Sequence, residues 1–268
     1  MKLEFLAMSE TGNPEGSRKG AYTAPALEKG LEILELLADA GEPLSAKNIA
    51  DSLGRSKNEI FRMVFVLVER GYLNRDAATD RLTLSNKLFE LGMRTPRSRK
   101  LVEVAMPAME QLSDDTGHSS HLVVINRGET VVIAAAAGSA ELNLTLRLGY
   151  RRPATEASSG QTIMAFQPAE KRARLIAESL ALSDEPHDPA ALDAILDRIV
   201  ADGSLVAQSH DLFGVVDVCA PILDRNGRAV ASVVVPCLSR RGAASSEDTV
   251  RAALVEMCRQ IGEALLER

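Results

Sequence analysis

Residues 43–73 limit most strongly what this chain can fold into, because they predict two short helices joined by a tight turn. Ser45 can cap the first helix, and Gly54 ends it. Ser56 and Glu59 then form the S-x-x-E capping box that starts a second helix. The apolar residues recur at helical spacing, first as Ile49, Ala50 and Leu53 and then as Ile60, Val64, Leu67 and Val68. The stretch therefore predicts a helix pair packed along one apolar side.

The outward side of the second helix carries polar and basic residues near its N-terminal end. A helix pair of this kind can place its second helix in the major groove of DNA, where such side chains meet phosphates and base edges. Basic residues on a helix are more often simply solvated, so the pair alone leaves both interpretations open. The candidate DNA contacts are Ser45, Arg55, Ser56, Lys57, Asn58, Phe61, Arg62, Arg75 and Arg81.

The flanking segments favour the DNA-binding interpretation. Residues 72–74 and 82–84 predict two short strands around a polar turn, with an arginine near each side of its tip. Ahead of the helix pair, an apolar stripe predicts a supporting helix that ends near Gly41. The stripe consists of Leu27, Leu31, Leu34 and Leu37. Three helices followed by a hairpin make a winged helix-turn-helix.

The net charge of −6 hides an uneven distribution along the chain. Residues 21–99 hold 12 Lys and Arg against 11 Asp and Glu, whereas residues 100–268 hold 16 against 23. The acidic second half cannot be a DNA surface, but the near-neutral first half with clustered basic residues can. Such a weak charge predicts a dimer, because pairing doubles the phosphate contacts.

The composition is that of a globular protein with room for two domains in 268 residues. No apolar run approaches the roughly eighteen residues of a membrane span. The opening MKLEFLAM is too short and too acidic for a signal peptide, and Met8 is an alternative start within a polar, disordered arm over 1–20. The cysteines are odd in number and lie among apolar residues, so we expect reduced thiols and a cytoplasmic protein. They are Cys219, Cys237 and Cys258.

After residue 100 the hydrophobic period changes from that of a helix to that of strands. A helix is predicted over 101–116, followed by a hairpin of residues 121–125 and 130–136. Further strands are predicted over 142–146, 214–222 and 229–235, and further helices over 158–180, 188–202 and 247–266. Antiparallel strands with helices at both ends predict an α+β fold, an α/β sandwich of the small-molecule sensor type.

Four segments, in this order, resemble the IclR family of transcriptional regulators. They are ALEKGLEILELLA, SAKNIADSLGRSKNEIFRMVFVLVERGYLNRD, GYRRPATEASSGQTIMAF and GVVDVCAPILDRNGRAVASVVV. The resemblance implies a winged helix-turn-helix domain over 21–85, a linker helix over 86–100 and a GAF-like effector-binding and oligomerisation domain over 101–268. It implies a homodimer or dimer of dimers on double-stranded operator DNA, without cofactor or metal, and puts Lys57 and Arg62 on basic positions of the recognition helix.

The same resemblance implies an effector pocket in the second domain. Its candidate residues are Ala154, Ser158, Ser159, Gly160, Val215, Asp217 and Val234. This chain departs from the family pattern at Asp217, where cysteine is usual, and at Val234 and Pro236, where serines are common. These departures predict an apolar pocket with one carboxylate. Such a pocket suits a small organic or aromatic acid that also carries a hydrogen-bond donor.

The sequence leaves several alternatives open for single residues and for the function of the chain. His118 and His121 have the spacing of half a metal site, but on a strand their side chains would point to opposite faces, which favours core or surface histidines. Asp217 needs a donor if it faces inward, either from a ligand or from a protein partner such as His210. Those two residues with Cys219 suggest an alternative function, a small-molecule enzyme on the GAF-like domain, although no phosphate loop or zinc signature is present. A winged-helix module for protein contacts is a third alternative.

Overall fold

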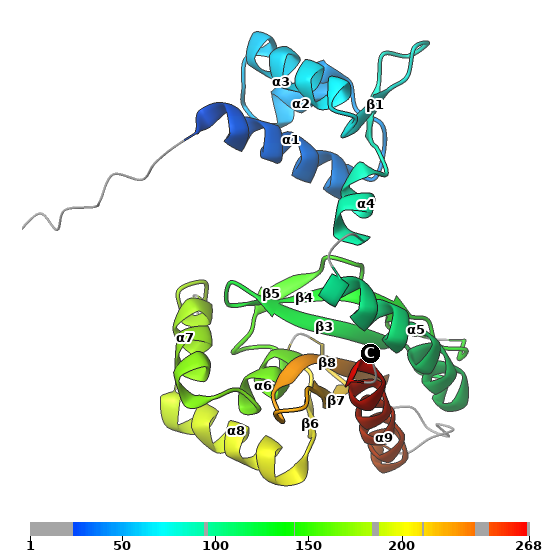
Figure 1. Ribbon diagram of the computed structural model, residues 1–268, viewed down its shortest axis with the longest axis vertical. Helices are drawn as coiled ribbons and strands as arrows, with labels where there is room; N and C mark the ends of the chain where they lie inside the picture. Colours follow the sequence, from blue (N-terminus) through cyan, green and yellow to red (C-terminus); the bar gives the residue numbers. More distant parts are fainter. Residues whose placement is uncertain are drawn as a thin grey trace, which may run out of the picture. The chain divides into compact units, whose positions relative to one another are not determined.

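The computed structural model describes residues 24–93, 96–141, 143–183, 188–210, 212–238 and 247–266. The chain divides into two compact units, with the boundary between Leu91 and Gly92 (Figure 1). The polar arm predicted over residues 1–20 lies outside the described residues.

The N-terminal unit is a winged helix-turn-helix, as predicted. Its helices are α1 (Pro25–Ala40), α2 (Ala46–Ser52) and α3 (Lys57–Glu69), and its wing consists of β1 (Leu73–Arg75) and β2 (Leu82–Leu84). The two wing strands pair antiparallel, and Leu44, ahead of α2, bridges to Leu82 in the wing. The core between the three helices and the wing is formed by Ile33, Leu37, Ile49, Ala50, Ile60, Val64, Leu73 and Leu82. A short helix, α4 (Lys87–Met93), follows the wing.

The prediction that one leucine stripe forms the buried face of α1 was only partly correct. The buried face is centred on Ile33 and Leu37, which lie four residues apart. Leu27 and Leu31 lie on the neighbouring face and are 62% and 48% exposed. Leucines recur on both faces of this helix, so spacing alone did not distinguish the core face from the exposed one.

The C-terminal unit is built on one antiparallel sheet of six strands in the order β5-β4-β3-β8-β7-β6. The strands are β3 (Ser120–Asn126), β4 (Glu129–Ala136), β5 (Arg151–Pro153), β6 (Leu205–Gln208), β7 (Val215–Leu223) and β8 (Ala229–Leu238). The central pair joins β3 to β8, with His121 opposite Val234. The sheet thus brings together segments more than a hundred residues apart in the sequence.

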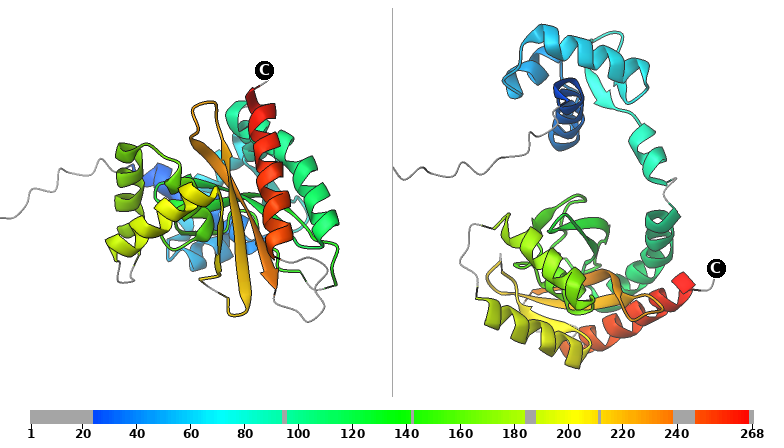
Figure 2. Two further views of the ribbon diagram at one scale, coloured as in Figure 1. Left: turned by 90° about the horizontal axis from the view of Figure 1, so that it is seen from below. Right: turned by 60° about the vertical axis from the view of Figure 1, so that its left-hand side comes forward.

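Helices cover both faces of this sheet, so the α/β sandwich is confirmed (Figure 2). One face packs against α5 (Pro96–Thr116) and α9 (Glu247–Leu266), and the other against α6 (Ser158–Ala165), α7 (Ala169–Leu180) and α8 (Pro189–Asp202). Side chains alternate along each strand, so in β8 Val233 and Val235 face α5 and α9 while Val234 faces α6. The helix predicted over 158–180 is broken at Phe166–Pro168, where α6 ends and α7 begins.

The prediction of a strand over 142–146 was wrong for residues 143–146, the part of it that the structure describes. Residues 143–146 are irregular, and the strand that follows β4 in the chain and pairs with its outer side is β5. The Asn143 side chain donates to the Gly138 carbonyl at 2.9 Å, and the Leu146 amide donates to His121 Nε2 at 2.8 Å. The Asn143 bond is local, and local side-chain bonds to the backbone compete with a strand ladder.

The segment predicted as a linker is largely helical. Helix α4 ends at Met93, and α5 begins at Pro96, a residue that suits the first turn of a helix. Residues 94 and 95 lie outside the described part of the chain. Residues 96–100 are therefore the first turns of α5.

Candidate DNA-binding surface and effector cavity

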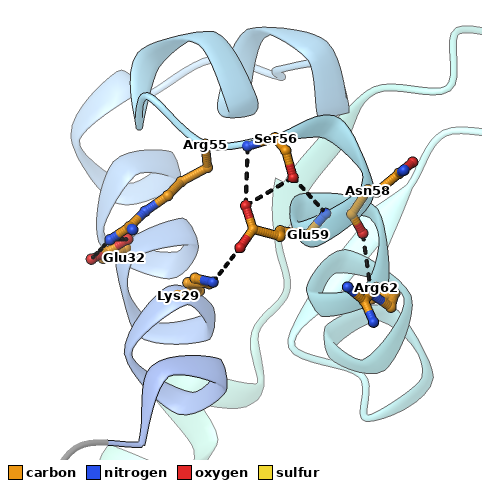
Figure 3. A network of polar contacts seen from close by, with 7 residues as sticks. All are labelled: Lys29, Glu32, Arg55, Ser56, Asn58, Glu59 and Arg62. Atoms are coloured by element: carbon orange, nitrogen blue, oxygen red, sulfur yellow. Dashed lines mark hydrogen bonds and ion pairs between the residues drawn. The ribbon is translucent and has the colours of Figure 1, made fainter.

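The start of helix α3 is held by the predicted capping box (Figure 3). Ser56 Oγ accepts from the Glu59 amide at 3.4 Å, and Glu59 Oε2 accepts from the Ser56 amide at 3.2 Å. The second Glu59 oxygen binds Lys29 Nζ of helix α1 at 2.5 Å. Sequence reasoning missed Lys29, which lies thirty residues away and carries no local signal.

The Lys29 and Ser56 contacts lower the pKa of Glu59 from 4.5 to about 2. A carboxyl group with a lowered folded pKa stabilises the fold fully above its unfolded value. This contribution is therefore present above pH 4.5 and is lost as the pH falls through about 2. At neutral pH the orientation of α3 relative to α1 is held by an ionised carboxylate.

Apart from Ser45 at the start of α2, the predicted DNA contacts lie on the exposed surface of α3, the preceding turn and the wing. Their side chains differ in the contacts that they make. Arg55 pairs with Glu32 at 3.0 Å, Arg75 with Asp80 at 3.5 Å, and Arg81 donates to the Pro43 carbonyl at 2.9 Å. Ser45 and Ser56 are caps of α2 and α3. The remaining four candidates are Lys57, Asn58, Phe61 and Arg62.

Lys57 and Arg62 form no ion pair within the described part of the N-terminal unit. Arg62 Nε makes only a long bond of 3.4 Å to the Asn58 carbonyl one turn earlier. Both side chains are exposed on the first half of α3. They can thus bind an anion without first breaking a protein ion pair.

Replacing Ser56 with alanine is expected to destabilise the start of α3 by about 1 kcal/mol, because the Glu59 amide loses its acceptor. DNA affinity is expected to fall, while the unfolding temperature of the C-terminal unit stays unchanged. Thermal unfolding and DNA titration of the full chain check both parts. Ser52→Ala, an exposed serine of helix α2, is the matched control. Equal losses in both units would mean that the cap does not act locally.

A cavity of about 200 Å³ lies in the C-terminal unit, on the sheet face that α6 covers. Its apolar wall is formed by Val123, Val132, Leu144, Leu146, Leu212, Val234 and Pro236. Its polar lining consists of His121, Thr130, Tyr150, Arg152, Glu156, Ser158, Ser159, Ser209, His210 and Asp217. A cavity with mainly apolar walls and several polar side chains suits a small molecule with a polar group.

Asp217 lies in β7, beside the start of α6. Ser158 Oγ donates to Asp217 Oδ2 at 3.1 Å, and Ser209 also donates to this carboxylate. Burial raises the pKa of Asp217, and the two serine bonds oppose that shift. His210 was the suggested protein partner of Asp217, but its Nδ1 lies 3.2 Å from Arg152 Nη2. The serine hydroxyls therefore hold this carboxylate, and no described cation pairs with it.

His121 is fully buried in the cavity wall, and burial lowers its pKa to about 4. The imidazole is therefore neutral at neutral pH. Its Nε2 accepts from the Leu146 amide at 2.8 Å, so the proton lies on Nδ1. Nδ1 is near the Val234 backbone but makes no hydrogen bond of good geometry in the described structure.

Arg152 and Glu156 form the other polar side of the cavity. Arg152 Nη2 lies 3.0 Å from Glu156 Oε2, and both side chains are largely buried. Arg152 belongs to β5, and its backbone pairs with Thr130. Neither residue is among the seven effector candidates, because nothing in the local sequence showed that this strand lines a cavity.

Four of the seven effector candidates line the cavity, namely Ser158, Ser159, Asp217 and Val234. The other three, Ala154, Gly160 and Val215, are buried nearby but do not line it. Gly160 is required for packing instead, since a Cβ there would lie 2.2 Å from the Ala154 carbonyl oxygen. Ala157 is the N-cap of α6, so Ser158 does not cap this helix. The Ser158 hydroxyl donates to Asp217 instead.

The described residues contain no group of three or more His, Cys, Asp and Glu side chains that could hold a metal ion. The three cysteines are buried free thiols. None of the described helices is long and apolar enough to span a membrane.

Two family models match this chain. The IclR helix-turn-helix domain matches residues 26–77, and the C-terminal domain of the bacterial transcriptional regulator IclR matches residues 93–263. The chain belongs to the IclR family of bacterial transcriptional regulators. The predicted family is thereby confirmed.

Curated relatives of this IclR-family chain are transcriptional regulators. The glycerol operon regulatory protein of Streptomyces coelicolor is 25% identical over 80% of this chain and 84% of its own length. The HTH-type transcriptional regulator BhcR of Paracoccus denitrificans is 27% identical over 98% of this chain and 97% of its own. The similarity thus extends over both units.

Solved IclR structures share the fold. The IclR protein of Thermotoga maritima has a TM-score of 0.66 at 25% identity, and the comparison covers 89% of this chain and 96% of that one. An IclR homologue of Microbacterium hydrocarbonoxydans, solved with 4-hydroxybenzoate, has a TM-score of 0.77 at 21% identity, over 90% of this chain and 98% of that one.

Proposed function

We propose that this IclR-type regulator binds a pseudo-palindromic operator as a homodimer or dimer of dimers, and that a small organic or aromatic acid in the C-terminal cavity modulates this binding. The protein acts in the cytoplasm, without a cofactor, and is not an enzyme. The observation that carries the proposal is the exposed start of α3, where Lys57 and Arg62 are free of ion pairs within the described residues.

The N-terminal unit supports the DNA-binding part. A capping box fixes the first turn of α3 (Figure 3). Lys57 and Arg62 are exposed on that half of the helix. The wing adds Arg75, whose guanidinium lies 5.6 Å from the centre of the Phe61 ring. The unit is nearly neutral overall, so one copy makes few phosphate contacts, and two copies on a palindrome double that number. The exposed Leu27 and Leu31 of α1 offer an apolar surface for pairing.

The cavity supports the effector part. The Asp217 carboxyl is half-buried, and its described partners are the hydroxyls of Ser158 and Ser209, so a ligand hydroxyl that donates to it offsets part of the cost of its burial. Arg152 has five N–H donors and can bind a ligand carboxylate beside Glu156. The valine and leucine walls suit an apolar body between the two ends. 4-Hydroxybenzoate, the ligand of the Microbacterium homologue, combines an acid, an aromatic ring and a hydroxyl.

DNA titration tests the function directly. A duplex from the region upstream of the protein's own gene is titrated at several salt concentrations, beside a scrambled duplex of equal composition. We expect a tighter and salt-dependent complex with the upstream duplex, and a shift in affinity when an effector is added. An enzyme or a protein-contact module would show no preference between the duplexes. Thermal-shift screening with small carboxylic acids, starting with 4-hydroxybenzoate, identifies the effector.

Replacing Asp217 with asparagine is expected to weaken effector binding roughly 10- to 150-fold, because the ligand loses a bond to a charged acceptor worth about 1.5–3 kcal/mol. The asparagine oxygen can still accept from Ser158, so the fold and the operator affinity without effector are expected to remain. Calorimetric titration with the screened acid measures the change. Asp193→Asn, on the exposed side of α8, is the control. Unchanged affinity, or an unfolded domain, would make this carboxylate structural.

A further inference from the structure

Two phenylalanines lie on the exposed surface of helix α3. Phe61 and Phe65 are 54% and 55% exposed and stand four residues apart, so their rings lie on one face of the helix. Val66 beside them is 47% exposed. This apolar row continues the face that begins with Lys57 and Asn58.

The fold of the N-terminal unit does not need these rings. Helix α3 packs into the core through Ile60 and Val64, and neither Phe61 nor Phe65 belongs to that core. The whole chain contains only six phenylalanines, so two of them in water on one short helix are a concentrated apolar surface. Exposed apolar groups of this kind mark a surface that is covered by a partner.

The charges around the rings identify the partner. Lys57 and Arg62 flank the row on α3, and the Arg75 guanidinium of the wing lies 5.6 Å from the Phe61 ring centre. Arginine and lysine suit phosphates, and a row of apolar groups between them suits the floor of a groove. In the major groove only thymine presents an apolar group, its 5-methyl.

We propose that Phe61 and Phe65 recognise thymine methyl groups in the major groove, and that the operator carries thymines opposite both rings in each half-site. This inference rests on the proposed function, because it requires α3 to enter the groove. The cations then position the helix on the backbone, and the two phenyl rings discriminate thymine from the other bases. Asn58, one turn ahead of Phe61, is placed to contact a polar base edge beside them.

The test replaces thymine by uracil, which lacks only the methyl group. A tight-binding duplex is first selected from a random library with the full-length protein, and each thymine of one half-site is then replaced singly. We expect one or two positions at which uracil lowers affinity about fourfold per buried methyl. With Phe61→Ala and Phe65→Ala, the ratio of thymine to uracil affinity at one of these positions is expected to fall to about one. Phe213→Ala, a fully exposed phenylalanine of the C-terminal unit, is expected to leave every ratio unchanged.

Three results would overturn the inference while leaving the proposed function intact. They are equal binding of thymine and uracil duplexes at all positions, unchanged ratios in both phenylalanine variants, and a change of oligomeric state in those variants, which would assign the rings to a second copy of the chain. If no sequence-specific, salt-dependent duplex can be selected at all, the proposed function itself fails, and the inference with it. Thermal unfolding of both variants is expected to match the unsubstituted protein, because the rings are outside the core.

Discussion

Replacing Arg62 with alanine is expected to weaken operator binding roughly 5- to 150-fold, equivalent to about 1–3 kcal/mol. Arg62 is exposed on the first half of α3, and within the described residues it makes only the long bond to the Asn58 carbonyl. Its loss removes a contact to DNA and breaks no ion pair among the described residues. If Arg62 contacts a base, discrimination at that one position is expected to relax. Competition titrations with single-base variants of the operator measure both effects.

The Lys57 variant distinguishes a phosphate contact from a base contact. Lys57→Ala is expected to weaken binding evenly across sequences and to reduce the slope of log affinity against log salt by about one, because a phosphate contact releases one counterion. Arg174→Ala, an exposed arginine of helix α7, removes the same charge outside the N-terminal unit and is the control. If both α3 variants keep the affinity and the salt slope of the unsubstituted protein, α3 does not enter the groove.

Replacing Gly160 with alanine is expected to destabilise the C-terminal unit by about 3 kcal/mol, the upper part of the range for overpacked interiors. The added Cβ would lie 2.2 Å from the Ala154 carbonyl oxygen and 2.7 Å from its Cα, and Ala154 is fully buried. Backbone atoms cannot move aside as the end of a flexible side chain can. The unfolding temperature is expected to fall by roughly 6–12 °C.

The same substitution is expected to abolish effector binding, because α6 carries Ser158, which holds Asp217 at the cavity. Gly30→Ala is the matched control. Gly30 also lies within a helix, but a Cβ there meets nothing within 4 Å, so this variant is expected to be neutral or up to about 1 kcal/mol more stable. Calorimetric unfolding measures the stability of both variants. An unchanged unfolding transition in the Gly160 variant would contradict the packing described for α6.

Local features of this protein were predictable from the sequence. The capping box of Ser56 and Glu59, the helix predicted over 188–202 and the final helix over 247–266 lie where the sequence predicts them. Each depends on residues within a few positions of one another, whose chemistry acts in almost any fold. The family resemblance extended the prediction to the order of the two domains' elements, since it compares the whole chain.

Tertiary structure alone decided which side chains meet. Ser158 and Asp217 are 59 residues apart, Arg152 and His210 are 58 apart, and the exposed Leu27 and Leu31 share their helix with the buried Ile33. These contacts follow from the strand order β5-β4-β3-β8-β7-β6 and from the register of each pair, such as Asp217 opposite Pro236. A register shift of one residue would turn Asp217 to the other face of the sheet, away from the cavity. That register is set by the packing of the two helical layers as a whole, and no short stretch of sequence contains it.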